Sequence, residues 1–421
     1  MVDVAGVVDD MTTAEQGVTA VVVTAVVVLL LGLFSGRLAP TYFLFLVGLA
    51  GMYALLSLGL NSQWGFGGLI NFSVAAFFGI GAYGAALVTA SNSPVSDGFS
   101  PVYGLAVALG LATVLALFIG LPTLRLRADY LAIASLGLAE VVRRIILNER
   151  HLTNGSLGVR GVPGFFADWP VLSTFPEAMP GLRIDVPLGA TVELGAPFYQ
   201  MLLNVLLVAV FAAGSYLLLS RVHRSPWGRV LRTIRSDEDL ARALGKNTFR
   251  FKLQAFVLGS LVMALAGVFY AHLQQFVGPG TLDPLTTFYV WVAVILGGSG
   301  SNRGALFGGV VIVAVREGPR FALGWLAGIL GSVSEALGAL GSGGPVGRLQ
   351  EFVVFLAGVI KATDVAAVRL VLVGLLIVAL MRLRPEGILP PQRELIWSSA
   401  VDEAPKRPDT GVREARGDDD D

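Results

Sequence analysis

The sequence contains no cysteine and only three histidines among its 421 residues. The absence of cysteine excludes disulfide bonds and thiolate metal sites, and His151, His223 and His272 lie far apart without the spacing of metal ligands. The Gly-rich run at 341–348 (GSGGPVGR) lacks the Lys-Ser/Thr pair that binds phosphate and magnesium in nucleotide-binding loops. We therefore expect no cofactor, no resident metal and no enzymatic activity on this chain.

Charged residues are also scarce. Lys and Arg together number 30, as do Asp and Glu, and the charged fraction is 14%, against about a quarter in soluble domains. The zero net charge gives no support for nucleic-acid binding. Hydrophobic residues make up 54% of the chain, whose mean hydropathy is +0.73. Several continuous apolar runs approach the roughly 20 residues that cross a bilayer, which predicts an all-α, polytopic protein surrounded by membrane lipid.

The apolar runs divide the chain into three parts. We expect a polar N-terminal segment at 1–17, a transmembrane domain at 18–390, and an acidic tail at 391–421 that is disordered because its hydrophobicity is low. Residues 317–366 are apolar but carry scattered charges, so they predict either interfacial helices or one further span. We predict about ten spans, at 18–35, 40–60, 60–88, 101–121, 130–147, 199–220, 253–276, 284–298, 305–316 and 367–383.

Short basic loops predict the orientation in the membrane, because Lys and Arg accumulate on the cytoplasmic side. The turn at 121–129 and the loop at 221–252 are both basic and are separated by two predicted spans, so both should be cytoplasmic. The acidic-leaning segment at 148–198 then lies outside. Counting the spans from these loops places both chain termini in the cytoplasm of a cell whose plasma membrane holds the protein.

The most strongly basic break between apolar runs is the loop at 221–252, with nine Lys or Arg against three acids. Its interior predicts two short helices. Ser225 is a candidate N-cap with Pro226 at the first helical position, and Ser236 restarts the pattern in capping-box spacing with Asp239. Gly245 is placed to end the second helix. Two capped helices favour docking onto another protein over a basic loop that only fixes the topology.

Polar residues and glycines interrupt the apolar run near residue 60. Helix-breaking backbone at membrane depth is tolerated only where protein or a water-filled cavity covers it, and a second glycine-rich break follows at 297–304 (GGSGSNRG). Paired breaks of this kind indicate a transport pathway, although each could also be a tight turn between spans. The candidate pathway residues of the first break are Asn61, Gln63, Gly65, Gly67, Gly68, Asn71 and Ser73.

Glu140 is a further candidate for the pathway, because ionisable groups at membrane depth are costly and often functional. Arg143 and Arg144 follow it at i,i+3 and i,i+4. This spacing favours the alternative of an ion pair at the membrane interface.

Several motifs together resemble the high-affinity branched-chain amino acid permeases of the LivM/LivH type, which belong to ABC importers. The spacing of Asp239, Ala241 and Gly245 resembles the coupling loop of importer permeases, and TNGSLGVRGVPG at 153–164 favours a LivM-like member. The resemblance covers roughly residues 50–315 and 367–390 and includes LNSQWGFGGLINFSVAAFFGIGAY, RADYLAIASLGLAEVVRRIILN, ILGGSGSNRGALFGG and RLRPEGIL.

The resemblance implies a permease subunit that works with two cytosolic ABC ATPase subunits, a second permease subunit and an external solute-binding protein. Permeases for urea and short-chain amides are similar, so the solute is inherited from the resemblance rather than shown by a residue. A self-sufficient secondary transporter is the competing class. The residues that the resemblance assigns to ATPase coupling are Arg229, Arg232, Arg235, Asp237, Glu238, Asp239, Ala241 and Gly245.

The orientation can be tested with single cysteines in this cysteine-free chain. A membrane-impermeant thiol reagent should label a cysteine at Ser173 in intact cells and should leave one at Ser236 unlabelled until the cells are opened. The opposite labelling pattern would overturn both the topology and the coupling-loop assignment.

Overall fold

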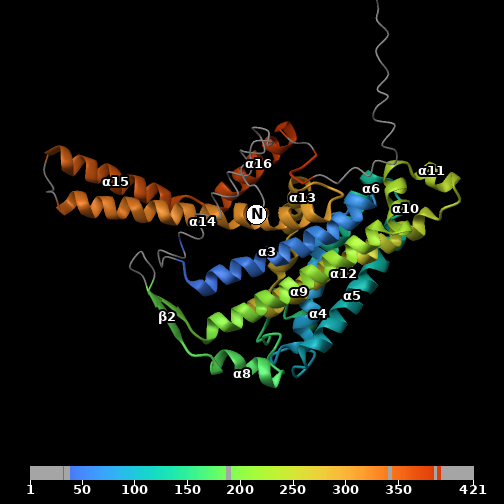
Figure 1. Cartoon of the computed structure of the whole chain (residues 1–421), viewed down its shortest axis with the longest axis horizontal. Coiled ribbons are helices and arrows are strands. Elements are labelled where there is room, and N and C mark those ends of the chain that lie inside the picture. The colour runs from blue at the N-terminus through green and yellow to red at the C-terminus, as the bar shows by residue number, and fades with distance from the viewer. Residues whose placement is uncertain (1–31, 33–37, 186–190, 340–343, 384–385, 390–421) are drawn as a thin grey trace, which may run out of the picture.

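A computed structural model describes residue 32 and residues 38–185, 191–339, 344–383 and 386–389. The expectations for the polar segment at 1–17, most of the span at 18–35 and the tail at 391–421 lie outside these residues. Within them the protein is mostly helical, with two short antiparallel pairs of strands (Figure 1).

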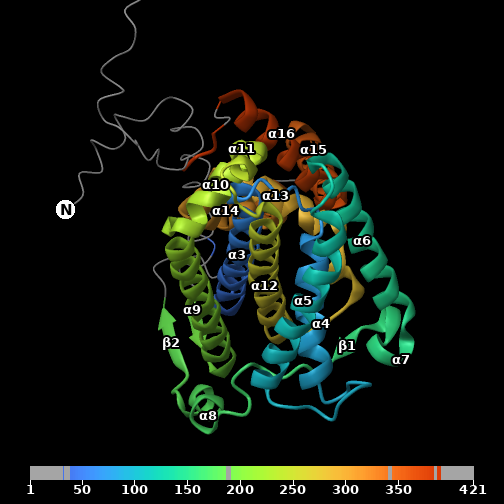
Figure 2. The ribbon, with the colours of Figure 1, turned by 90° about the vertical axis from the view of Figure 1, so that its right-hand side faces the viewer.

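The core is formed by α3 (Pro40–Leu60), α4 (Val74–Thr89) and α12 (Thr248–Gln274). These helices are apolar on all sides, as expected of helices buried inside a membrane bundle, and α3 and α12 are mostly buried. The flanking helices α5 (Pro101–Thr123) and α9 (Ala196–Arg224) are less buried and present apolar residues outward. Figure 2 shows these helices side by side, with α6 (Ala128–Asn148) at the edge.

Glycines let the core helices approach one another at backbone distance. A Cβ at Gly59 of α3 would lie 2.6 Å from the carbonyl oxygen of Gly259 in α12. A Cβ at Gly267 of α12 would collide with the carbonyl oxygen of Phe78 in α4. Small residues at crossings compensate for the weak hydrophobic drive between helices in lipid, where van der Waals packing provides much of the association.

The two ends of the bundle carry different elements, and both views separate them (Figures 1 and 2). One end, the coupling end, holds the π-helix η1 (Asn61–Phe66), α10 (Pro226–Ser236) and α11 (Glu238–Ala243). The other holds α8 (Pro170–Ala178) and the antiparallel strands β2 (Leu182–Asp185) and β3 (Thr191–Leu194). Toward this second end, β1 (Val159–Arg160) pairs antiparallel with β4 (Phe276–Val277). Three short helical elements lie in the loops between the longer elements: α7 (Arg150–Thr153), η2 (Gly155–Leu157) and η3 (Pro279–Leu282).

The C-terminal third differs from the prediction of a short span at 305–316. After α13 (Pro284–Gly297), α14 (Asn302–Ala339) continues as one 38-residue helix, and α15 (Gly344–Ala362) packs back along it. The hairpin of α14 and α15 extends to the left of the bundle in Figure 1. The helix α16 (Val365–Leu383) follows after a bend of 77°. Pro319 lies inside α14 without ending it.

The predicted number of about ten spans is not confirmed. Among the described residues, five helices are long and apolar enough to cross a membrane, or six if the bent pair α15–α16 counts as one. Of the other predicted spans, α4 and α13 are apolar but shorter, at 16 and 14 residues. The five qualifying segments are Pro40–Phe66, Pro101–Thr123, Ala196–Arg224, Thr248–Gln274 and Asn302–Ala339.

The close helix crossing predicts a sharp difference between two glycines. Gly267→Ala should lower the stability by about 1–3 kcal/mol, because the added methyl must separate α12 from the backbone of α4. Gly214→Ala in α9 is the matched control: nothing lies within 4 Å of its Cβ position, so this change should be neutral or stabilise by up to about 1 kcal/mol. Thermal unfolding in detergent measures both, and equal effects would contradict the backbone-contact account.

Candidate coupling site

The loop at 221–252 folds into the two short helices that the sequence predicts, with a correction at each N-cap. Ser225 precedes α10 as predicted, but its hydroxyl donates to the carbonyl of Val222 at 2.6 Å and makes no capping hydrogen bond. The Asp237 carboxylate accepts hydrogen bonds from the backbone N–H groups of Asp239 and Leu240, both at 2.9 Å, so Asp237 caps α11. The predicted cap Ser236 is instead the last residue of α10, and its hydroxyl donates to the carbonyl of Arg232. The ionised carboxylate makes the stronger bonds to the positive helix end, which explains the shift.

The end of α11 follows the prediction. Gly245 has φ +73°, and its N–H donates to the carbonyl of Arg242 at 2.9 Å, while the N–H of Lys246 donates to the carbonyl of Ala241 at 3.1 Å. These two bonds form a Schellman motif that satisfies the last carbonyls of the helix. Nothing lies within 4 Å of a Cβ placed on Gly245, so only the backbone conformation restricts this position.

Ion pairs fix α11 to the start of α12. Glu238 lies 2.7 Å from the Arg242 guanidinium and 2.9 Å from the Lys252 ammonium. Burial is the largest single influence on Glu238 and acts to raise its pKa, while hydrogen bonds from Lys252 and Thr248 lower it. With the charges of Lys252 and Arg242 added, the pKa lies below its ordinary value of 4.5. The stabilisation is thus present above pH 4.5 and is lost as the pH falls through the lowered value.

The two helices have an inner and an outer side. Ala241 is buried, whereas Leu240 and Leu244 are 51% and 65% exposed. Arg229 on α10 and Asp239 on α11 also point outward and are exposed. The outer side therefore combines apolar and charged side chains on short, capped helices.

Arg235 connects this loop to both glycine-rich breaks. Its Nη1 donates to the carbonyl oxygen of Gly65 in the first break, and its Nη2 lies 3.4 Å from the Ser299 hydroxyl in the second. Gly68, at φ +69°, lies directly under α10, since a Cβ there would come within 3.3 Å of the Arg235 Cα. Residues separated by some 170 positions in sequence thus meet at one end of the bundle.

The two breaks also bind each other through asparagines. The side-chain oxygen Oδ1 of Asn61 accepts a hydrogen bond from the backbone N–H of Gly300 at 2.8 Å, and the side-chain amide of Asn61 donates to Oδ1 of Asn302 at 3.2 Å. A Cβ at Gly65 would collide with the Asn61 side chain and lie 2.5 Å from the Gly300 nitrogen. Glycine at this position is therefore required by the close approach of the two breaks.

His223 at the end of α9 completes the junction and was not singled out from the sequence. The Asn302 amide donates to His223 Nδ1 at 3.3 Å and to the Ser220 hydroxyl at 3.2 Å, which leaves His223 Nε2 to donate to the Ser62 hydroxyl at 3.1 Å. The imidazole also stacks on Phe66, with ring centroids 3.7 Å apart. The feature of the sequence that points to His223 is its position at the boundary between an apolar run and the basic loop.

The remaining pathway candidates lie deeper in the same region. The Gln63 amide donates to the Phe256 carbonyl at 2.7 Å, and its oxygen accepts from the Asn71 amide at 2.7 Å. The Ser73 N–H donates to the Asn71 oxygen at 2.8 Å. Together with Asn61, these side chains have zero exposure, so in this conformation protein groups rather than a water-filled route satisfy them. Their role in a pathway stays a prediction.

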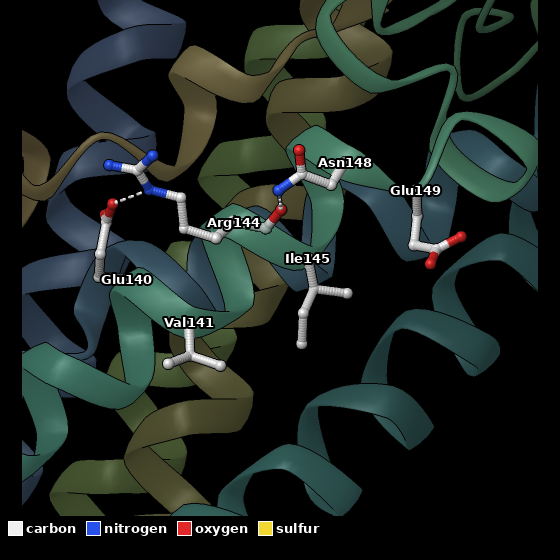
Figure 3. A pocket seen from close by; sticks show the side chains of 6 residues that line it. All are labelled: Glu140, Val141, Arg144, Ile145, Asn148 and Glu149. Carbon is white, nitrogen blue, oxygen red and sulfur yellow. Dashed lines mark hydrogen bonds and ion pairs between the residues drawn. The ribbon is translucent and has the colours of Figure 1, made fainter.

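Glu140 lies apart from this junction, on α6. Its carboxylate binds Arg143 at 2.6 Å and Arg144 at 2.7 Å and is 35% exposed. Figure 3 shows it in an open pocket along one side of α6, together with Val141, Ile145, Asn148 and Glu149. This geometry agrees with the local ion pair that the spacing favoured.

The fold and this site define a polytopic helical membrane protein whose polar loop is hydrogen-bonded into the broken ends of its core helices. Residues 42–381 match the family described as branched-chain amino acid transport system / permease component, and the chain belongs to this family. The resemblance inferred from the motifs is confirmed.

Curated relatives include two permease proteins named LivM and one named LivH. The "High-affinity branched-chain amino acid transport system permease protein LivM" of Escherichia coli (strain K12) is 31% identical over 281 residues, which are 63% of this chain and 61% of that protein. A probable LivM of Methanocaldococcus jannaschii is 25% identical, covering 63% and 78%. A LivH of Salmonella typhimurium is 26% identical, covering 63% and 81%. No solved structure matches significantly.

The alignment thus spans about three fifths of the length of the Escherichia coli relative.

The hydrogen bond from Arg235 to Gly65 should protect the first break. Arg235→Ala should raise amide hydrogen exchange across residues 65–68 by roughly 10- to 100-fold, because a charge-assisted bond to a buried carbonyl is lost. The exposed residue Arg229 on the same helix provides the control, and Arg229→Ala should leave exchange unchanged. Unaltered exchange in the Arg235 variant would show that the contact does not stabilise the break.

Proposed function

We propose that this chain is the permease subunit of an ATP-binding-cassette importer that carries branched-chain amino acids across the plasma membrane. Membership of the permease family and the printed names of the LivM and LivH relatives support this proposal. Cytosolic ATPase subunits, a second permease subunit and an external solute-binding protein complete the complex. The chain itself hydrolyses no ATP.

The observation that carries the proposal is the two-sided α10–α11 pair. Its outer side exposes Leu240 and Leu244 between charged residues, which suits a partner protein that buries apolar side chains. Its inner side sends Arg235 to Gly65 and Ser299. A displacement of these helices by a partner would therefore act directly on both breaks of the transmembrane domain.

The π-helix η1 is the segment of the transmembrane domain on which this displacement would act. The hydrogen-bonded turn of a π-helix contains one residue more than that of an α-helix, and such segments are frequent at functional sites. In this chain η1 holds Asn61, which joins the second break, and Gly65, which accepts from Arg235. In the proposed mechanism, ATP-driven closure of the ATPases shifts α10, and the two broken ends move together as the spans change access between the two sides.

The end opposite the coupling loop would face the outside. Here α8 and the β2–β3 pair project beyond the helices, and they provide the surface onto which the binding protein would deliver its solute (Figure 2). Residues 388 and 389 hydrogen-bond to Leu296 and Gly297 at the coupling end, which agrees with a cytoplasmic C-terminus. The same orientation gives a cytoplasmic N-terminus.

A self-sufficient secondary transporter would need a carboxylate at membrane depth that is free to bind a coupling ion. Glu140 is held by two arginines, and Glu317 of α14 lies 3.4 Å from Arg316 and 3.9 Å from Arg369. Neither carboxylate has the unpaired character that this alternative requires. A permease of the same family for urea or short-chain amides stays an alternative for the solute.

The capped end of α11 provides the test. Gly245→Val should lower solute-stimulated ATP hydrolysis and uptake severely, because a β-branched residue at φ +73° costs on the order of 1 kcal/mol or more and changes where the helix ends. Insertion and thermal stability should be preserved, since no neighbouring atom is disturbed. Uptake and ATPase activity in proteoliposomes, with and without the ATPase partner, measure the effect.

Gly245→Asn is the matched control, because asparagine tolerates the left-handed conformation better than valine. It should keep most of the activity. Normal uptake by the valine variant, or equal damage from asparagine, would refute the docking role of the capped helix. Uptake without any ATPase would refute the importer itself.

A further inference from the structure

A cluster of charged side chains lies inside the transmembrane domain, away from the coupling site. Arg316 and Glu317 of α14 and Arg369 of α16 form ion pairs at 3.4 and 3.9 Å. The side chains are 29%, 13% and 20% exposed, respectively. We call these three residues the charged cluster.

Two buried tyrosines form one wall of the cluster. The Arg316 guanidinium lies 5.6 Å from the ring centroid of Tyr53 in α3 and 5.7 Å from that of Tyr289 in α13, and it donates to the Tyr53 hydroxyl. Both tyrosines are almost fully buried, with exposures of 0% and 4%. Residues from four helices, α3, α13, α14 and α16, thus meet at the charged cluster.

The charged cluster lies at membrane depth. Arg316 is fourteen residues beyond Asn302, or about 21 Å along α14 from the coupling end at 1.5 Å per residue. Arg369 precedes the end of α16 at Leu383 by the same number of residues, and the chain after α16 returns to the coupling end. Both arginines therefore lie inside a hydrocarbon core of about 30 Å, about 6 Å beyond its middle as counted from the coupling end.

The charges of the cluster do not cancel. Among the residues that the structure describes, the ion pairs bring two guanidinium groups to one carboxylate, which leaves the cluster with a net positive charge. The buried Nε atoms of Arg316 and Arg369 make no hydrogen bond within the part of the chain that the structure describes. Partly exposed charge at this depth cannot face lipid without a large cost, so the open side of the cluster must face a polar route or an anion.

A broken helix adjoins the cluster. The helices α15 and α16 meet at a bend of 77°, and Asp364 in this break accepts the N–H of Ala366 at 2.8 Å. Arg369 follows one turn later. The break lies 18 residues before Leu383, or about 27 Å from the coupling end at 1.5 Å per residue. Discontinuous helices are a recurring element of solute sites in membrane transporters, because they present polar groups where continuous helices present none.

We propose that the charged cluster, with Tyr53 and Tyr289, is an intramembrane site for a carboxylate-bearing solute, and that Glu317 contacts the ammonium group of an amino acid. Arg316 and Arg369 hold the carboxylate through their guanidinium N–H groups. This inference rests on the proposed import of amino acids and adds a reason to favour them over urea and amides, which carry no carboxylate.

Three probes separate the chemical features of the solute. Equilibrium dialysis against the protein in nanodiscs, with its permease and ATPase partners, should detect leucine and isovalerate, which share the carboxylate. Leucinamide, which has the ammonium but no carboxylate, should not bind measurably. Binding of leucinamide as strong as that of leucine would refute carboxylate recognition.

Variants assign the binding to the cluster. Arg369→Gln and Arg316→Gln should each weaken leucine and isovalerate binding by roughly 10- to 100-fold, because each removes a charge-assisted contact. Arg369→Lys should keep most of the affinity, which separates a lost charge from a lost fold, and Arg348→Gln on the exposed side of α15 is the control. Glu317→Gln should weaken leucine but preserve or strengthen isovalerate.

The outcomes distinguish this site from the function on which it rests. If both glutamine variants fold, by thermal unfolding and basal ATP hydrolysis, and bind leucine like the unmodified protein, the site is refuted while amino-acid import stands. If isovalerate binds at the arginines but leucine does not, the carboxylate site stands and amino-acid import is refuted. A Glu317→Gln variant that affects both probes equally would refute the ammonium contact.

Discussion

The structure depends on satisfying polar backbone where the core helices break at the coupling end. The carbonyl oxygen of Gly65 needs a hydrogen-bond donor, and the Arg235 guanidinium provides it. The second break offers the N–H of Gly300, and Asn61 provides the acceptor. Because unpaired backbone groups are costly inside a membrane, these two contacts allow glycine-rich breaks to exist at the ends of otherwise apolar helices.

This requirement links the first break to the loop at 221–252. The group that satisfies Gly65 belongs to α10, so movement of the loop changes the hydrogen bonding of the break. The imidazole of His223, stacked on Phe66 and bonded to Asn302, ties the end of α9 to the same junction. A permease that is driven by partner subunits needs such a connection, whereas a permease driven by an ion would need a free carboxylate inside the membrane.

Charge within the domain follows the same principle. Glu140 is neutralised locally by residues three and four positions along its own helix, so sequence spacing alone predicted its ion pairs. Arg316, Glu317 and Arg369 come from two helices, α14 and α16. The Arg316 guanidinium also packs against aromatic rings from two others, α3 and α13. Only the packing of these four helices could bring them together, which explains why the segment at 317–366 carried no functional prediction.

The sequence by itself determined the helical membrane class, the permease family, and the two short helices ended by Gly245, because hydropathy, motif spacing and caps act over a few neighbouring residues. The tertiary structure decided what the sequence left open or placed wrongly: the cap at Asp237, the continuous α14, and the meeting of Arg235 with Gly65. Some 170 residues separate that pair. Such contacts depend on how whole helices cross, and local patterns contain no information about that geometry.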